Sequence, residues 1–325
     1  MLTKDKKLAR KDTGLNRQLQ RARNVVRHLV NGDLQQYLEA GYSDYNNKRR
    51  REKWRKLFEG NKKTYVIKNL GHGVKMRCYQ DSWLSKLIYW GVFERDEQEF
   101  VSSYLGKGDI VIDVGAHYGL YTLLAAKAVG SSGHVYAFEP TAKTHERLLD
   151  HIKDHDTQNV TAYRMAISDC EGQTSINTMH DGKEACNTLT APGQGDSFTA
   201  EKVNTTTLDS FVNNNHLHGK VKLIKIDVEG WESQLLDGGK ELLASEDAPV
   251  LLIEFNEQMA KAAGSTCKVL YEKLEKFGYQ MFIYESSGKK FIREHEWKNY
   301  DYKNLIISKR PEEFIERIRG AKIIS

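Results

Sequence analysis

The chain has 325 residues, a formal net charge of +5 and 39% hydrophobic residues, which is enough sequence for one large core or two smaller ones. No apolar run reaches the roughly 18 residues of a membrane span, and no signal-peptide core follows the first residues. The four cysteines, Cys78, Cys170, Cys186 and Cys267, form no Cys-x-x-Cys pair. We therefore expect a soluble cytoplasmic protein with free thiols, without structural zinc or a redox couple.

Residues 1–62 are expected to form a basic, helical N-terminal segment. Residues 1–60 hold about sixteen Lys and Arg against about seven Asp and Glu. Apolar residues between Leu15 and Leu38 recur at helical spacing, which indicates amphipathic helices. A second basic run, Lys48–Lys56, follows the turn-rich residues Gly41–Asn47. These charges form either a solvated helix face or a site for an anionic carrier, an acidic glycan or a membrane surface, to which the protein would bind peripherally.

Residues 63–108 are expected to lead into a catalytic domain that spans residues 109–325. Alternating apolar and polar residues in 64–68 and 73–79 predict a hairpin, and residues 81–91 and 94–105 predict two helices. Beyond them strands alternate with helices, which is typical of an α/β fold with a doubly wound, mostly parallel sheet. The expected strands are 110–114, 134–139, 160–165, 221–228, 250–255, 279–284 and 304–308, and the expected helices are 142–155, 208–214, 231–243 and 267–277. Residues 168–204 predict a hairpin and a mobile loop.

A glycine-rich bend follows the first strand of this domain. Gly115 and Gly119 flank it, and glycines there would let the backbone approach a ligand that a Cβ would block. Glu139 ends the next strand about twenty residues later, which is the spacing of an acid that binds a ribose. The pattern predicts a ligand that contains a nucleoside, although such bends also serve plain packing between a strand and a helix.

The bend also indicates which nucleoside ligand fits. A dinucleotide needs a third glycine and an open helix N-terminus for its pyrophosphate. This chain has two glycines, and the bulky Tyr118 stands where the diphosphate would lie. S-adenosylmethionine (SAM) has a ribose and an adenine but no phosphate, so SAM is the cofactor that we predict.

Charged residues follow two other strands of the predicted sheet. Lys225, Asp227 and Glu229 share one face of a strand that the fold should cover, and Glu254 lies near the end of the next strand. If these strands are neighbours, the three acids converge beside the nucleoside site at the carboxyl edge of the sheet. The alternative is structural: Lys225 neutralises Asp227, and Glu229 caps the helix that starts near residue 231.

Methyl transfer to an alcohol would use such a cluster. An alcohol is a poor nucleophile at neutral pH, so a base or a divalent ion must help to remove its proton. Asp227, Glu229 and Glu254 are hard oxygen donors that suit Mg²⁺ or Mn²⁺, and they suit a metal-free base equally well. The sequence leaves both mechanisms open.

Five motifs in this order and spacing resemble the FkbM family of SAM-dependent methyltransferases. They are Asp113–Gly119, Phe138–Pro140, Thr207–Asp209, Ile224–Glu232 and Leu252–Glu254, with Gly91–Glu94 upstream. The resemblance covers roughly residues 81–256. It implies a class I, Rossmann-like fold with a seven-stranded sheet, and O-methylation of a hydroxyl on a sugar or secondary metabolite. It also implies that Asp113, Gly115 and Gly119 line the methionine end of the cofactor, Glu139 the ribose and residues 166–169 the adenine.

The bend departs from the family at His117, where relatives usually have Asn. A histidine can donate a hydrogen bond to the cofactor or act as a base. The predicted catalytic residues are therefore Asp227, Glu229, Glu254, Lys225 and His117. The predicted cofactor-binding residues are Asp113, Gly115, His117, Tyr118, Gly119, Glu139, Pro140, Ala166, Ile167, Asp227 and Glu94. Five other histidines, His72, His145, His151, His155 and His180, are expected at the surface or in loops.

The expected partner is a sugar or glycan acceptor. A nucleic-acid methyltransferase is the main rival, because it would use the basic N-terminal segment, but the chain has neither an Asn-Pro-Pro-Tyr motif nor a Pro-Cys nucleophile. A non-catalytic binding module would keep the fold and lose the acids, whereas all of them are present here. The sequence does not fix the oligomeric state, and a homodimer is one option.

Overall fold

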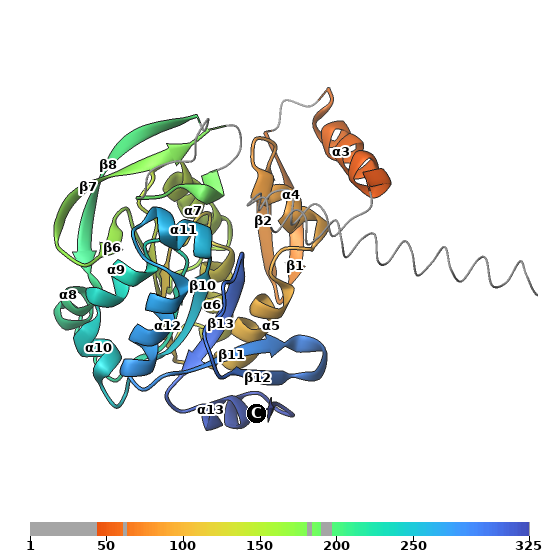
Figure 1. The fold of residues 1–325 in the computed structure, drawn as a ribbon. Coiled ribbons are helices and arrows are strands. Elements are labelled where there is room, and N and C mark those ends of the chain that lie inside the picture. The colour runs from red at the N-terminus through yellow and green to blue at the C-terminus, as the bar shows by residue number, and fades with distance from the viewer. Residues whose placement is uncertain (1–43, 61–63, 181–183, 190–196, 325) are drawn as a thin grey trace, which may run out of the picture. The chain divides into compact units, whose positions relative to one another are not determined.

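The computed structural model of the protein describes residues 44–60, 64–180, 184–189 and 197–324 (Figure 1). The chain divides into two units, residues 1–62 and residues 63–325. Of the first unit, helix α3 (Asp44–Phe58) and the two residues after it are described. The helices expected between Leu15 and Leu38 lie outside the described residues.

Helix α3 carries the basic run of residues 48–56. The helix already begins at Asp44, so the expectation of a turn that continues to Asn47 is wrong. Asn and Asp favour turns and helix N-termini alike, and here they form the first helical turn. Within the helix, the rings of Trp54 and Phe58 lie one turn apart, with 5.2 Å between their centroids.

Five parallel strands form one half of the central sheet, in the order β5-β4-β3-β9-β10. They are β3 (Ile110–Val114), β4 (His134–Phe138), β5 (Val160–Tyr163), β9 (Val221–Ile226) and β10 (Val250–Phe255). All six residues of β10 are buried, as expected of a strand covered on both faces. The strand order reverses between β3 and β9, because the chain runs outward from β3 to β5 and then returns to the other side of β3. Ligands bind at the carboxyl edge of the strands at such a reversal.

The other half of the sheet is largely antiparallel. It adds β13 (Lys303–Ser308), β11 (Gln280–Glu285), β12 (Lys290–Glu294) and β14 (Lys322–Ile324) beyond β10. Within the described residues the sheet therefore has nine strands, two more than the seven that the family resemblance implies. The additional strands are β12, which returns from β11 through the turn η2 (Ser286–Gly288), and β14. Both are short and carry charged residues, so their hydrophobic pattern is weak.

Helices pack on both faces of the sheet (Figure 1). The described helices after residue 63 are α4 (Trp83–Trp90), which packs on the β1–β2 hairpin, and α5 (Arg95–Tyr104), α6 (Leu120–Val129), α7 (Ala142–Asp154), α8 (Leu208–Asn214), α9 (Glu232–Asp237), α10 (Lys240–Ala244), α11 (Glu257–Ala262), α12 (Cys267–Lys276) and α13 (Glu312–Arg317). The single helix expected over residues 231–243 is wrong, because Gly238 and Gly239 separate α9 from α10. A Cβ on Gly238 would lie 2.0 Å from the carbonyl oxygen of Ser168, so this close contact requires glycine where the helix breaks.

Two smaller sheets accompany the central one. The predicted hairpin is confirmed as β1 (Tyr65–Gly71) and β2 (Val74–Tyr79), which pair antiparallel. The hairpin predicted within residues 168–204 is also confirmed. It consists of β7 (Gly172–Met179) and β8 (Phe198–Thr207), with β6 (Ala166–Ser168) parallel to β8 and the short helix η1 (Glu184–Cys186) between β7 and β8.

The main core lies between the parallel strands and their helices. Ile112, Ile224 and Leu251 are adjacent on β3, β9 and β10, and all three are fully buried. None of the described helices is both long and apolar enough to cross a bilayer. All four cysteines are free thiols. The core thus fixes the strand ends whose loops carry the predicted site.

Candidate functional site

The chain leaves β3 through a bend that contains three left-handed residues. Gly115, His117 and Gly119 have φ angles of 76°, 52° and 90°. The backbone N–H groups of Gly115 and Ala116 donate to the carbonyl oxygen of Phe138 over 3.0 and 2.9 Å. The bend is therefore fixed to the end of β4, at the carboxyl edge of the sheet.

Packing requires glycine at position 115, and both glycines of the bend have left-handed φ angles. A Cβ on Gly115 would lie 1.8 Å from the carbonyl oxygen of Asp227, and a Cβ on Gly119 would lie 2.5 Å from Cδ1 of Leu148. The sequence reading, in which these glycines make room for a ligand, missed these contacts. Glycine at position 115 instead lets β3 and β9 bring their terminal loops together, which places the bend beside Asp227.

Glu139 is buried at the end of β4 and surrounded by donors. Its Oε2 accepts the backbone N–H of His117 at 3.0 Å, whereas its Oε1 accepts the hydroxyls of Thr141 and Thr144 at 2.6 and 2.7 Å. Burial raises the pKa of Glu139, although these hydrogen bonds oppose the shift. The predicted ribose acid is thus held in one position over the bend.

Asp113 lies directly below the bend, on β3, and is 1% exposed. Its Oδ2 accepts the hydroxyl of Thr122 at 2.6 Å. Its Oδ1 is buried and has no hydrogen-bond partner among the described residues. A buried carboxylate oxygen without a donor is costly unless a ligand supplies one. Asp113 therefore fits a cationic or N–H-bearing group, such as the amino end of a methionine.

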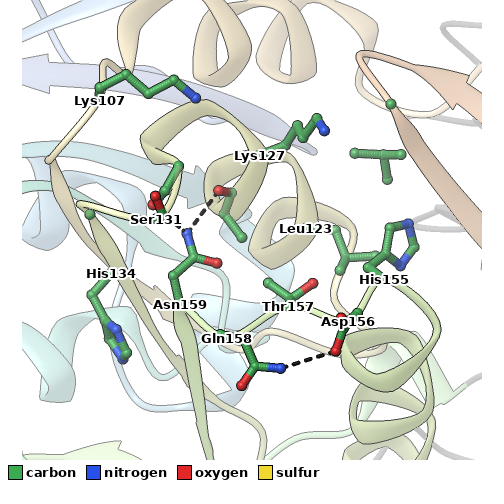
Figure 2. A pocket seen from close by; sticks show the side chains of 15 residues that line it. Lys107, Leu123, Lys127, Ser131, His134, His155, Asp156, Thr157, Gln158 and Asn159 are labelled. Atoms are coloured by element: carbon green, nitrogen blue, oxygen red, sulfur yellow. Dashed lines mark hydrogen bonds between the residues drawn. The ribbon is translucent and has the colours of Figure 1, made fainter.

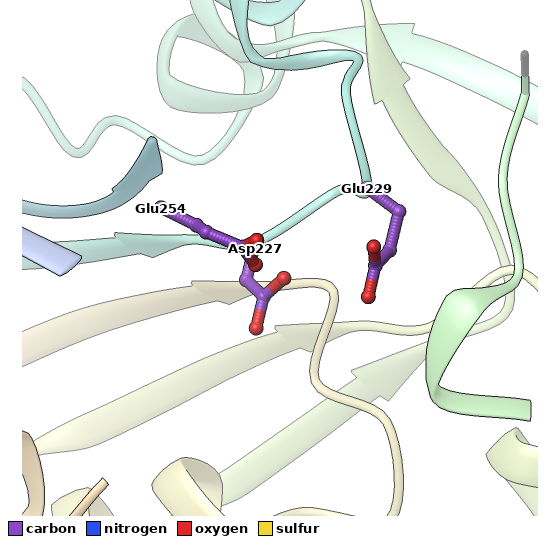
Figure 3. Close-up of side chains that lie close together, drawn as sticks. All are labelled: Asp227, Glu229 and Glu254. Carbon is purple, nitrogen blue, oxygen red and sulfur yellow. The ribbon is translucent and has the colours of Figure 1, made fainter. Parts of the chain in front are cut away.

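Three carboxylates meet at the ends of β9 and β10. One oxygen from each of Asp227, Glu229 and Glu254 lies within 4.8 Å of the others (Figure 3). Lys225 is 4% exposed, and its Nζ donates to Asp227 Oδ2 at 2.8 Å. The structure thus brings together all four of the charged residues predicted from the two strand ends. The carboxyl group of Glu229 also has a buried oxygen, Oε2, without a hydrogen-bond partner in the described part of the chain.

The four charges affect one another's ionisation. Burial lowers the pKa of Lys225, but the carboxylates of Asp227, Asp113 and Glu94 outweigh it, so that its pKa is raised overall. Burial opposes ionisation of Asp227, yet Lys225 keeps the pKa of Asp227 below its ordinary value. Burial and neighbouring acids raise the pKa of Glu229 and of Glu254 well above the ordinary value of a Glu. The pKa values of Glu229 and Glu254 are thus shifted in the direction opposite to that of Asp227.

Glu94 forms a separate part of the buried network. Its Oε2 accepts the hydroxyl of Tyr121 at 2.6 Å, and its Oε1 accepts Asn304 Nδ2 at 2.7 Å and the hydroxyl of Tyr302. Burial raises the pKa of Glu94, whereas Lys225 lowers it. Sequence reasoning found Glu94 through its resemblance to the family, but it missed Tyr302 and Asn304. Neither residue stands in a motif. Asn304 lies on β13, which pairs antiparallel with β10, and Tyr302 directly precedes that strand.

His117 lies in the bend with its ring against Tyr118. Both ring nitrogens are buried and have no hydrogen-bond partner among the described residues. Burial lowers the pKa of His117 to about 3. The ring is therefore neutral at physiological pH and can donate or accept one hydrogen bond from each nitrogen. Its φ of 52°, like the φ of 51° at Glu229, is uncommon for a residue with a Cβ and is typical of functional sites.

The side chain of Tyr118 is 1% exposed. Its hydroxyl hydrogen-bonds Ser82 and donates to Glu184 Oε1 at 3.0 Å. The carbonyl oxygen of Tyr118 accepts Nδ1 of His151 at 2.7 Å, while Nε2 of that histidine accepts the backbone N–H of Arg77. His151 is fully buried, so its predicted place at the surface is wrong. The side chains of Tyr118 and His151 thus hold the bend against the β1–β2 hairpin.

The predicted adenine side is formed by backbone. Ala166 and Ile167 on β6 are 7% and 1% exposed, so their side chains serve the core. Next to them, Ser168 Oγ accepts the indole N–H of Trp231 at 3.0 Å. Pro140 is partly exposed, directly after Glu139. Pro140 and residues 166–168 can offer backbone groups and surface to a ligand, and the exposed Asp169 adds a carboxylate.

A cavity of about 460 Å³ lies elsewhere, at the opposite edge of the same strands. Its lining includes Lys107 before β3, His134 at the start of β4 and Asn159 before β5 (Figure 2). Asn159 Nδ2 donates to the carbonyl oxygens of Ala126 and Gly130 at the end of α6. This cavity contains none of the predicted site residues.

The sequence profile of the methyltransferase FkbM domain matches residues 113–281, which include the bend, the ribose acid and the acidic cluster. The chain belongs to the FkbM methyltransferase family. It is thus a methyltransferase of the SAM-dependent class I type, as its α/β fold with a largely parallel central sheet also indicates. A search of curated proteins found no match.

Solved structures of methyltransferases resemble this FkbM protein remotely. A SAM-dependent O-methyltransferase from Thermotoga maritima is 14% identical, with 78% of this chain and 80% of that chain covered and a TM-score of 0.38. TYW2 from M. jannaschii, in complex with AdoMet, is 15% identical, with 76% and 85% covered and a TM-score of 0.39. The precorrin-6y C5,15-methyltransferase from Geobacter metallireducens is 15% identical, with 66% and 86% covered and a TM-score of 0.36.

Proposed function

We propose that this FkbM protein transfers a methyl group from SAM to a hydroxyl of a sugar, in a surface glycan or a glycosylated metabolite. The observation that carries the proposal is the convergence of Asp227, Glu229 and Glu254 within 4.8 Å. A cluster of acids at this edge can remove a proton from an alcohol, which is the step that O-methylation requires.

The residues around the bend fit SAM. The free oxygen of Asp113 would accept the ammonium of the methionine end, and Glu139 would accept the ribose hydroxyls. His117 would contribute one neutral donor or acceptor to the same ligand. When bound, SAM supplies an already activated methyl group. The protein then has to orient the acceptor hydroxyl and take its proton.

We assign the proton transfer to Glu229. Burial and the neighbouring Asp227 raise the pKa of Glu229, which makes its carboxylate a stronger base than an ordinary Glu. Asp227 stays ionised beside Lys225, and its negative charge favours the positive charge that SAM brings. Glu254, 4% exposed, shares the proton of the cluster and limits how many charges it carries.

A divalent ion is the alternative role of the same acids. Carboxylate oxygens are the ligands that Mg²⁺ and Mn²⁺ prefer, and the three acids offer one oxygen each at a common point. Such an ion would lower the pKa of an acceptor hydroxyl that it binds. In that case Asp227, Glu229 and Glu254 hold the ion, and none of them takes the proton.

The basic helix α3 is the candidate contact for an anionic carrier or a membrane surface. Its run of Arg and Lys from residue 48 to 56 would attract phosphates or acidic lipids. The four free thiols fit a reducing cytoplasm, where SAM is made available. Nucleic acid remains the rival acceptor, and the same basic residues would serve it.

Transfer of a labelled methyl group tests the acceptor class. Incubation of the protein with methyl-labelled SAM and an extract of its source cells should place the label in carbohydrate. After acid hydrolysis the label should appear in a methylated monosaccharide, and it should survive mild alkali, since ethers resist conditions that cleave methyl esters. Label in a nuclease-sensitive fraction, or label released by alkali as methanol, would contradict the proposal.

A further inference from the structure

A short described segment between β7 and β8 contacts three of the loops that carry predicted cofactor and transfer residues. We call this segment, Glu184–Leu189, the strap; it begins with η1. The loops in question follow β3, β4 and β9 and carry His117, Glu139 and Glu229. No sequence motif marks the strap, which lies in the region 168–204 for which the sequence predicts a hairpin and a mobile loop.

Each of these three loops forms one hydrogen bond with a side chain of the strap. The hydroxyl of Tyr118, in the bend, donates to Glu184 Oε1 at 3.0 Å. Asn187 Nδ2 donates to the hydroxyl oxygen of Thr141, the residue that also holds Glu139, at 3.3 Å. The hydroxyl of Thr188 donates to the backbone carbonyl oxygen of Glu229 at 2.8 Å. The strap therefore spans the carboxyl edge from the bend to the acidic cluster.

Glu184 and Thr188 of the strap are buried and have polar partners. Glu184 is 7% exposed and lies 3.5 Å from Arg147, whose guanidinium stacks on the ring of Tyr79 at 3.9 Å. Thr188 is 4% exposed and pairs with Asn177 of β7 through two backbone hydrogen bonds of 2.8 and 3.2 Å. Buried polar side chains with satisfied partners indicate a built contact rather than a loose loop.

The contact with Glu229 has a particular consequence. Glu229 and Gly230 are consecutive residues with left-handed φ angles of 51° and 100°. Glu232 Oε1 accepts the N–H groups of Val228 and Gly230 at 3.2 Å each, which holds the turn from one side. On the strap side, the hydroxyl of Thr188 donates to the carbonyl oxygen of Glu229, which lies between these two residues. The strap thus contributes to the conformation that directs the carboxylate of Glu229 into the cluster.

We propose that the strap is the covering wall of the SAM site and that it must leave the edge whenever the cofactor enters or its product leaves. Its contact with Thr141 lies beside the predicted ribose acid, Glu139, and its contact with Glu229 lies beside the acidic cluster. This inference rests on the proposed function only in placing the cofactor at the bend. Breaking the two contacts should open the wall without removing a residue that binds the cofactor.

Cofactor exchange tests the proposal. The probe is S-adenosylhomocysteine (SAH), with association and dissociation rates measured by stopped-flow tryptophan fluorescence on the full chain. In the double variant Asn187→Ala/Thr188→Val both rates should rise about 4- to 100-fold, because each lost hydrogen bond contributes a factor of about 2–10. The affinity should change much less than the rates, since a wall slows entry and exit alike.

Two variants serve as controls. Thr188→Ser keeps the hydroxyl and should exchange SAH at the wild-type rates. Thr178→Val removes a similar hydroxyl of the same hairpin, which donates to the carbonyl oxygen of Thr199 at 2.7 Å, away from the strand-end loops, and should also leave the rates unchanged. Unchanged rates in the double variant, or an increase in dissociation alone, would overturn the proposal. Failure of the wild-type protein to bind SAH would instead refute the placement of the cofactor.

Discussion

Replacing Glu229 with Gln is expected to lower the rate of methyl transfer about 10²- to 10⁴-fold, the usual contribution of a general base. The amide has nearly the same shape and can keep the left-handed turn, but it cannot take a proton. Because burial and Asp227 raise the pKa of Glu229, the wild-type rate should rise with pH above the ordinary pKa of a Glu. This rise should disappear in the variant.

Matched measurements separate a base from a metal ligand. Glu272→Gln, on the exposed side of α12 with 47% of its side chain accessible, should keep full activity. If Glu229 is the base, a chelator leaves the wild-type rate unchanged. Loss of activity with the chelator and recovery with Mg²⁺ or Mn²⁺ would indicate that the acids are metal ligands. Full activity of Glu229→Gln would exclude Glu229 from either mechanism.

Replacing Lys225 with Met should destabilise the protein by about 3–5 kcal/mol, the usual effect of removing one partner from a buried ion pair. Lys225 is 4% exposed, and its positive charge lies among Asp227, Asp113 and Glu94. Without it, Asp227 remains buried beside other acids. Urea unfolding at neutral pH measures the loss. Lys222→Met is the matched control on the same strand, because its 3.4 Å pair with Glu313 is partly exposed and should contribute no more than about 1 kcal/mol.

The effect of Lys225→Met should also depend on pH. In the wild-type protein the pKa of Asp227 is lowered, so its contribution to stability is present above the unfolded pKa and is lost as pH falls through the folded pKa. In the variant the folded-state pKa of Asp227 should rise above the unfolded value. Asp227 should then lower the stability of the protein as pH rises. The deficit of the variant should therefore be smallest below the ordinary pKa of an Asp and should grow as pH rises towards neutral. An equal deficit at acidic and neutral pH would show that the loss is one of packing.

The parallel half of the fold could be predicted from the sequence because its strands are continuous apolar runs. Strand β10 and helix α8 have the predicted bounds, 250–255 and 208–214. The antiparallel edge could not be predicted as well. Strand β12, with the sequence Lys-Phe-Ile-Arg-Glu, owes its place to pairing with β11, and a short polar strand carries little signal of its own.

The acids of the site could be predicted for a similar reason. A charge such as Asp227 at the end of a buried strand conflicts with its surroundings, and that conflict is visible in one sequence. Residues that contact these acids from other elements cannot be recognised in the sequence in this way. Asn304 and Thr188 are ordinary polar residues in their own segments, and only the folded chain brings them to Glu94 and Glu229.

The glycines of the bend show how one signal can have two origins. A glycine with positive φ allows close approach, but the sequence does not say what approaches. At Gly115 the approaching group is the carbonyl oxygen of Asp227. The glycine is therefore evidence that the loops after β3 and β9 lie in contact. The evidence for a cofactor comes instead from the unpartnered oxygen of Asp113 and from the hydrogen-bonded carboxylate of Glu139.

Calorimetric titration with SAH tests the central claim, that a SAM site lies between the bend and Glu139. We predict one SAH molecule bound per chain, and an affinity about 10- to 100-fold weaker in Glu139→Gln, because that variant loses the charge on a buried hydrogen-bond acceptor. No heat of binding in the wild-type protein at millimolar SAH, or equal affinity in the two proteins, would contradict the account.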